Sequence, residues 1–163
     1  MATGTASGGA ARTSVEWEQG ELVIARHFGA PPARVFELWT RAEHFAAWFG
    51  PEGTTLPHCT LDARPGGILH FCHHHANGED VWVRGVYDEV AAPDRLAFTC
   101  WFSDPEGRRV ERPGFPAEMR IAATFVDDGG GTLLTIRQAG LVTDQGEVAG
   151  WTETLDRLDR LVA

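Results

Sequence analysis

Lysine is absent from this sequence. The Lys and Arg total of 14 consists of arginine alone, and the formal net charge is -9. No run of basic residues offsets the excess of acidic side chains. A net acidic chain without a basic segment repels phosphate backbones and anionic lipid headgroups, so we expect neither nucleic acid nor a membrane surface to be a partner.

Long apolar runs and paired cysteines are also missing. No stretch of about 18 apolar residues could span a bilayer. The three cysteines, Cys59, Cys72 and Cys100, show no C-x-x-C spacing and give no disulfide framework. Residues 1–14 consist mostly of small residues without the apolar centre of a secretory signal, which predicts a flexible tail. We therefore expect a cytoplasmic protein, and no residue pattern indicates a cofactor.

Large aromatic residues, in contrast, are abundant. The 163 residues include six Trp and nine Phe, which bury the largest area per residue and line cavities well. The length fits one domain with a single sizeable core. We therefore expect residues 15–163 to form one domain with an aromatic-lined interior.

Hydrophobic periodicity predicts the order of the secondary-structure elements. Apolar β-formers predict a first strand over about 15–29. Two short helices are predicted between residues 31 and 50, because two prolines open the segment and Gly-Pro ends it. From Thr54 to Arg137, short apolar or alternating runs separated by turn residues predict about six strands in an antiparallel meander.

The final segment predicts a long amphipathic helix. Apolar residues recur at helical spacing over about 18 residues, at Val148, Trp151, Leu155, Leu158 and Val162. Asp144 and Glu147 have the spacing of a capping box at the start of this helix. One sheet and this helix must therefore bury each other.

Four segments, in matching order and spacing, resemble one known family. They read APPARVFELWTRAEHFAAWFGPEG, DARPGGILHF, RGVYDEVAAPDRLAFT and GWTETLDRL. From about residue 15 to 163 the chain is similar to bacterial domains related to the activator of the heat-shock chaperone ATPase, within the START-like or SRPBCC superfamily. The resemblance implies an α+β helix-grip fold, in which a curved antiparallel sheet wraps around the long C-terminal helix and two short helices close a cavity. Many relatives carry a histidine just before the Gly-Trp pair, and this sequence has none there.

The segment HFCHHH, residues 70–75, is the most unusual local feature. Side chains alternate along a strand, so Leu69, Phe71 and His73 lie on one side. The resemblance implies that this side faces the cavity. His73 then either exchanges a hydrogen bond or a proton with a ligand, or is a half-buried histidine satisfied by a carbonyl or water.

The opposite side of this strand carries His70, Cys72 and His74, and imidazole with thiolate suits zinc. The three span roughly 13 Å at about 3.3 Å per residue, too far to reach one ion together. A metal site would need two neighbours and a ligand from elsewhere, such as His58 or Cys59. The simpler interpretation is the solvated outer face of a strand, so no metal is expected.

A set of mostly apolar residues is predicted to bind a ligand in the cavity. Its members are Trp48, Phe49, Leu69, Phe71, His73, Trp151 and Leu155. The segment 112–119, rich in Pro and Gly, is expected to form a rim over the entrance. The sequence leaves open which face Trp82 and Trp101 take.

Three functions remain open at this stage. The first is binding of a small hydrophobic molecule, such as a lipid, a polyketide-like or an aromatic compound. The second is an enzyme that acts on such a molecule, as a cyclase, dehydratase or hydrolase, with His73 or Tyr87 as acid or base. The third, implied by the family name alone, is stimulation of a chaperone ATPase. Edge strands of such a sheet could also pair two copies into a homodimer.

Overall fold

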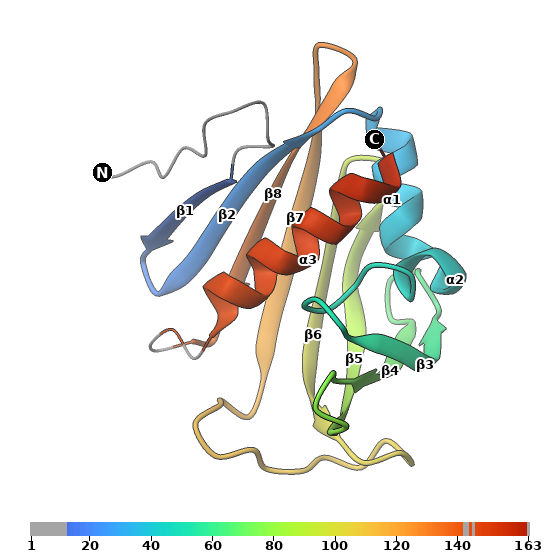
Figure 1. The fold of residues 1–163 in the computed structure, drawn as a ribbon, viewed down its shortest axis with the longest axis vertical. Helices are drawn as coiled ribbons and strands as arrows, with labels where there is room; N and C mark the ends of the chain where they lie inside the picture. The colour runs from blue at the N-terminus through green and yellow to red at the C-terminus, as the bar shows by residue number, and fades with distance from the viewer. Residues whose placement is uncertain (1–12, 142–143, 145, 163) are drawn as a thin grey trace.

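The computed structural model describes residues 13–141, 144 and 146–162 (Figure 1). Its elements are β1 (Thr13–Glu18), β2 (Glu21–Phe28), α1 (Pro32–Thr40), α2 (Ala42–Phe45), β3 (Thr55–Leu61), β4 (Ile68–His74), β5 (Asp80–Ala91), β6 (Arg95–Ser103), β7 (Met119–Asp128), β8 (Gly131–Ala139) and α3 (Glu147–Val162). The strands form one eight-stranded sheet in the order β1-β2-β8-β7-β6-β5-β4-β3. Every neighbouring pair is antiparallel.

Helix α3 crosses one face of the curved sheet, and α1 and α2 lie to one side of it (Figure 1), with α1 in contact with β7 and β8 and α2 in contact with β3. This is the helix-grip arrangement that the family resemblance implies. The meander from β3 to β8 contains six strands, as expected, because each apolar run is separated from the next by turn residues.

The N-terminal part differs from the prediction in two ways. The single strand predicted over about 15–29 is a hairpin, because Gln19 (φ 49°) and Gly20 (φ 80°) reverse the chain between β1 and β2. Left-handed backbone at two consecutive positions is a turn conformation that Gly favours. The tail predicted over residues 1–14 is also too long, because β1 begins at Thr13 and pairs with β2. Residues 1–12 lie outside the described part of the chain.

The core joins all three helices to the sheet through aromatic rings. Trp39 of α1 is 1% exposed, and its ring stacks on that of Trp151 of α3 at 6.2 Å between centroids and 20°. It also packs edge-on against Phe125 of β7, at 6.0 Å. Aromatic pairs at these distances add to the stability that burial alone provides. Trp39 therefore fixes the separation between the helices and the sheet.

Polar contacts hold α3 in place on both sides. Arg26 of β2 is buried and donates to Asp156 at 2.6 Å between Nη1 and Oδ1. On the other side, Arg157 donates to the carbonyl of Gly50 at 2.8 Å, and Arg160 pairs with Glu52 at 2.7 Å. The N-terminus of α3 is capped by Asp144, whose Oδ1 accepts from the N–H of Val148 at 3.3 Å. The helix is therefore tied to β2 and to the chain that follows α2.

Candidate ligand-binding cavity

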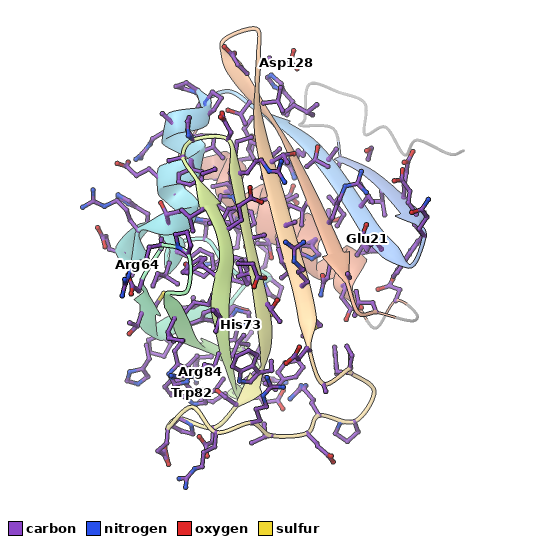
Figure 2. The ribbon with its side chains drawn as sticks, turned by 180° about the vertical axis from the view of Figure 1, so that it is seen from behind. Glu21, Arg64, His73, Trp82, Arg84 and Asp128 are labelled. Atoms are coloured by element: carbon purple, nitrogen blue, oxygen red, sulfur yellow. The ribbon has the colours of Figure 1, made fainter. Side chains whose placement is uncertain are left out.

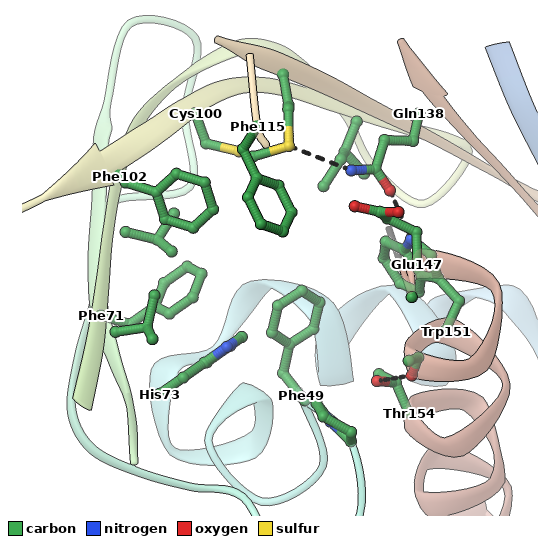
Figure 3. Close-up of a pocket in the computed structure, with 18 of the residues that line it drawn as sticks. Phe49, Phe71, His73, Cys100, Phe102, Phe115, Gln138, Glu147, Trp151 and Thr154 are labelled. Carbon is green, nitrogen blue, oxygen red and sulfur yellow. Dashed lines mark hydrogen bonds between the residues drawn. The ribbon is translucent and has the colours of Figure 1, made fainter. Parts of the chain in front are cut away.

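A cavity of about 300 Å³ lies between α3 and the sheet. Figure 3 shows its wall, with α3 on one side and the strands opposite. Most of the lining is apolar and comes from the segment after α2, from β4 to β7, and from α3. These residues are Phe49, Phe71, Val81, Val83, Phe98, Cys100, Phe102, Met119, Ile121 and Trp151.

Strand alternation directs these side chains inward. On β5, Val81, Val83, Gly85 and Tyr87 are buried, while the residues between them are partly exposed. The first two of the four line the cavity. Because the period of a strand is two, one face of the sheet supplies a continuous apolar wall. The apolar cavity therefore follows from the same pattern that predicts the strands.

The rim is built by the segment between β6 and β7. Phe115 packs edge-on against Phe102, at 5.3 Å between ring centroids. The guanidinium of Arg112 lies over both rings, at 5.5 Å from Phe102 and 5.7 Å from Phe115. Its Nη2 is 3.5 Å from the carboxylate of Glu79 in the β4–β5 turn. The expectation that residues 112–119 lie at the cavity agrees with this geometry, because Arg112, Phe115 and Met119 all contribute to the lining.

His73 places an imidazole in this apolar wall. Its ring lies 5.2 Å from that of Phe71 and 5.6 Å from that of Phe49. The atom Nε2 is shielded from solvent and has no hydrogen-bond partner among the described residues. Burial, with smaller contributions from His75 and Arg157, lowers the pKa of His73 from 6.5 to about 3. The imidazole is therefore neutral at physiological pH.

Two buried polar side chains of the lining, Gln138 and Thr154, make hydrogen bonds with their neighbours. The indole N–H of Trp151 donates to Oε1 of Gln138 at 2.7 Å, and Nε2 of Gln138 donates to the sulfur of Met119 at 3.4 Å. The hydroxyl of Thr154 donates to the carbonyl of Gly150 at 2.6 Å. Both side chains are buried. Figure 3 shows Gln138 and Trp151 on the side of the cavity opposite Phe71 and His73.

The thiol in the wall is not activated. Burial raises the pKa of Cys100 to about 12. A thiol is nucleophilic only as the thiolate, so Cys100 acts as a small apolar wall residue. Burial also raises the pKa of Cys59, to about 11.

The structure divides the residues predicted to bind a ligand into two groups. Phe49, Phe71, His73 and Trp151 line the cavity. Trp48, Leu69 and Leu155 do not, and each is at most 1% exposed within the packed core. Trp48 donates its indole N–H to the carbonyl of Leu38 at 2.9 Å. These three residues support the wall from behind, because helix spacing and strand alternation predict burial without separating the lining from the layer beneath it.

Tyr87, the other residue considered for acid–base chemistry, also lies outside the lining. It is buried on the same face of β5 as Val83, four residues further along, and its ring centroid is 6.0 Å from that of Phe98. Burial raises its pKa above the usual value of 10. The phenol is therefore a core residue and does not join His73 at the cavity.

Two histidines on the outer side of the histidine strand lie close to polar partners. His74 Nδ1 is 2.6 Å from Asp80, and His70 Nε2 is 3.3 Å from the hydroxyl of Ser103. Cys72 is buried, and its pKa is raised mainly by that burial. Within residues 13–141, 144 and 146–162, no three His, Cys, Asp or Glu side chains are placed to hold a metal ion.

Trp82 and Trp101, whose face the sequence leaves open, both point away from the cavity. Trp82 stacks on His58 with 5.2 Å between ring centroids, and Arg109 covers Trp101 at 4.1 Å. Figure 2 shows Trp82 on the side of the sheet that faces away from α3. Neither residue lines the cavity.

Sequence reasoning missed Gln138, which belongs to the inner wall. Its signal is the same as that of His73: a polar residue at an inward position of an apolar strand row. On β8 the row is Leu134, Ile136 and Gln138, all buried. A polar side chain on such a row needs a hydrogen-bond partner inside the fold, and Trp151 supplies it.

Comparisons with known proteins identify the family. The family model described as "Activator of Hsp90 ATPase homolog 1-like protein" matches residues 29–163, so the chain belongs to this family. Among curated proteins, the comparison finds no match. None of the helices in the described part of the chain has the length and hydrophobicity needed to cross a bilayer.

Solved structures share the fold over nearly the whole chain. Protein Ms6760 from Mycobacterium smegmatis is similar with a TM-score of 0.81 and 21% identity, covering 93% of this chain and 96% of that chain. Protein CV1439 from Chromobacterium violaceum has a TM-score of 0.77 and 26% identity, with 89% and 98% covered. The AHSA1 protein of Silicibacter pomeroyi has a TM-score of 0.72 and 24% identity, with 86% and 96% covered.

Proposed function

We propose that this protein binds and carries a small, largely apolar molecule in the cavity between α3 and the sheet. The observation that carries the proposal is an apolar cavity of about 300 Å³ walled by aromatic and aliphatic side chains. This volume is at the lower end of the range of ligand sites, about 300–1,000 Å³. A hollow of this size is not a packing defect, since protein interiors otherwise contain few voids larger than a water molecule.

The energetics are consistent with weak binding of small probes. A ligand that loses about 300 Å² of apolar surface to the wall gains about 7.5 kcal/mol at ~25 cal/mol/Å². Lost translational and rotational freedom opposes this gain by about 4 kcal/mol or more. We therefore expect dissociation constants in the millimolar range for a probe that buries only this much surface, and tighter binding for ligands that bury more.

Catalysis has less support than carriage. A general base works best with a pKa near the working pH, whereas the pKa of His73 is about 3. Tyr87 is not at the cavity, and the thiol of Cys100 is not ionised at neutral pH. The enzyme hypothesis would therefore have to rely on His75, Arg112 or Glu147, the other titratable side chains of the lining. Stimulation of a chaperone ATPase is supported by the family description alone.

Native mass spectrometry, combined with binding of the neutral dye N-phenyl-1-naphthylamine, tests the proposal. We expect the protein to bind one dye molecule and to release a small molecule, chemically unchanged, on solvent extraction. Ile121→Trp places an indole in the cavity and should weaken dye binding at least tenfold. Val126→Trp is the matched control, since Val126 is on the same strand and 54% exposed. Dye binding that Ile121→Trp leaves intact would contradict the proposal.

A further inference from the structure

We propose that the buried part of the ligand is uncharged and carries a hydroxyl or carbonyl group that forms a hydrogen bond with Nε2 of His73. This inference rests on the proposed function, because it concerns the chemistry of the molecule held in the same cavity. It follows from three properties of the wall: one polar atom without a partner, the engagement of the other inner polar groups, and the location of the charges.

The first property is the unpartnered ring nitrogen. A buried polar group without a hydrogen bond costs about 1–3 kcal/mol, so such atoms are uncommon in folded proteins. Nε2 of His73 is shielded from bulk water and finds no partner among the described residues. The ring lies between Phe71 and Phe49 and points into the cavity (Figure 3). A ligand in the cavity is therefore placed to supply the missing partner.

The second property is that the buried polar side chains on the opposite side of the cavity already make hydrogen bonds. Gln138 is held by Trp151 and Met119, and the Thr154 hydroxyl by the carbonyl of Gly150. The indole donor of Trp151 fixes which end of the carboxamide is the oxygen. His75 also lines the cavity, and its Nδ1 is 3.5 Å from the hydroxyl of Thr54. In contrast to Gln138, Trp151 and Thr154, His73 has a buried polar atom without a hydrogen bond to any described residue. The neutral ring can donate or accept there, depending on its tautomer, so both a hydroxyl and a carbonyl fit.

The third property is that the charges in the lining leave no counter-ion for an anion. The charged side chains there are Arg112 and Glu147. Arg112 lies at the rim, over two phenyl rings and 3.5 Å from Glu79. An anionic ligand would therefore compete with Glu79 for Arg112 and would share the cavity with the carboxylate of Glu147. The neutral His73 cannot compensate a buried charge either, and burying an uncompensated charge is strongly unfavourable.

Three naphthalene probes of similar shape test the inference: 2-naphthol, 2-methylnaphthalene and 2-naphthoate. At pH 7 the first is neutral with a hydroxyl, the second is apolar and the third is anionic. We expect His73→Phe to weaken 2-naphthol binding about tenfold, corresponding to loss of one hydrogen bond. The same variant should leave 2-methylnaphthalene within about twofold, which also shows that the cavity is intact. Wild-type protein should bind 2-naphthoate at least tenfold more weakly than 2-naphthol.

Two further variants complete the design. His74→Phe is the matched control, because His74 is on the same strand but on its outer side, paired with Asp80; it should change none of the three affinities. His73→Gln retains a hydrogen-bonding side chain and should keep part of the preference for 2-naphthol over 2-methylnaphthalene.

Equal losses of 2-naphthol and 2-methylnaphthalene in His73→Phe would overturn the inference, since His73 would then contribute shape alone. Binding of 2-naphthoate as tight as that of 2-naphthol would overturn it as well. In both cases the proposed function would stand. If neither the naphthalenes nor N-phenyl-1-naphthylamine binds to the wild-type protein, the proposed function itself fails, and the inference fails with it.

Discussion

Replacing Val83 by phenylalanine tests whether the space between α3 and the sheet is free apolar volume. Val83 is buried on the inward row of β5 and lines the cavity. Phenylalanine adds about four carbon atoms, and at ~0.8 kcal/mol per buried carbon the largest possible gain is about 3 kcal/mol. The ring keeps some contact with solvent and loses rotamer freedom, so we expect a gain of about 1–2 kcal/mol in the free energy of unfolding.

The same substitution should weaken ligand binding, because the ring occupies part of the 300 Å³. Urea unfolding followed by tryptophan fluorescence measures the stability, and titration with N-phenyl-1-naphthylamine measures the affinity. We expect a higher urea midpoint together with at least tenfold weaker dye binding. Opposite signs for stability and affinity are characteristic of a cavity kept open for a ligand.

Val86→Phe is the matched control, because Val86 lies on the outer face of the same strand and is not part of the lining. It should leave dye binding unchanged. A loss of more than about 1 kcal/mol of stability in Val83→Phe, with Val86→Phe neutral, would refute the reasoning. Such a loss is the usual cost of overpacking a space that is already filled.

Three other predictions concern the polar groups and the rim. Trp151→Phe removes the donor to Gln138 and leaves a buried carboxamide oxygen unpaired. Urea unfolding should therefore show a loss of about 1–3 kcal/mol in the free energy of unfolding. Trp17→Phe, at an exposed position, is the control and should cost no more than about 0.5 kcal/mol. The pKa of His73 is lowered from 6.5 to about 3, so the unfolded chain binds a proton that the folded chain does not. Stability should therefore fall as the pH drops below 6.5, by up to about 1.4 kcal/mol per pH unit, and a pH series of unfolding curves should show a smaller fall in His73→Phe. Arg112→Ala removes the contacts of the guanidinium with Phe102, Phe115 and Glu79 at the rim. The rates of dye entry and release, measured by stopped flow, should both rise severalfold with little change in affinity. Equal rates in the variant and the wild type would contradict a role for the rim.

The order of elements could be predicted because each carries a strong local pattern. Apolar runs separated by turn residues define six strands, and the spacing from Val148 to Val162 defines α3. The hairpin at Gln19 and Gly20 was missed because a two-residue turn interrupts an otherwise continuous run of strand formers. Turns of this kind depend on backbone conformation at two positions, which composition indicates only weakly.

The candidate site could be predicted only in part. Alternation tells which side of a strand a residue faces, but not whether that residue borders the cavity or lies in the packed core beside it. It placed Phe71 and His73 on the inward row of β4, where both line the cavity, but it gave no reason to separate Leu69 from them. Leu69 lies nearer the start of the strand, outside the lining, and is buried in the core. Which part of a row borders the hollow is decided by packing between distant segments, such as Phe102 against Phe115.

The central claim is that a ligand enters the space between α3 and the sheet, and the indole N–H signals of the six tryptophans test it most directly. N-phenyl-1-naphthylamine is added stepwise to ¹⁵N-labelled protein, with single Trp→Phe variants to assign the signals. The account predicts a saturable shift of the Trp151 signal, since Trp151 lines the cavity, while the signals of Trp17 and Trp82 stay in place. A shift at Trp82 or Trp17 with an unchanged Trp151 signal would contradict the account.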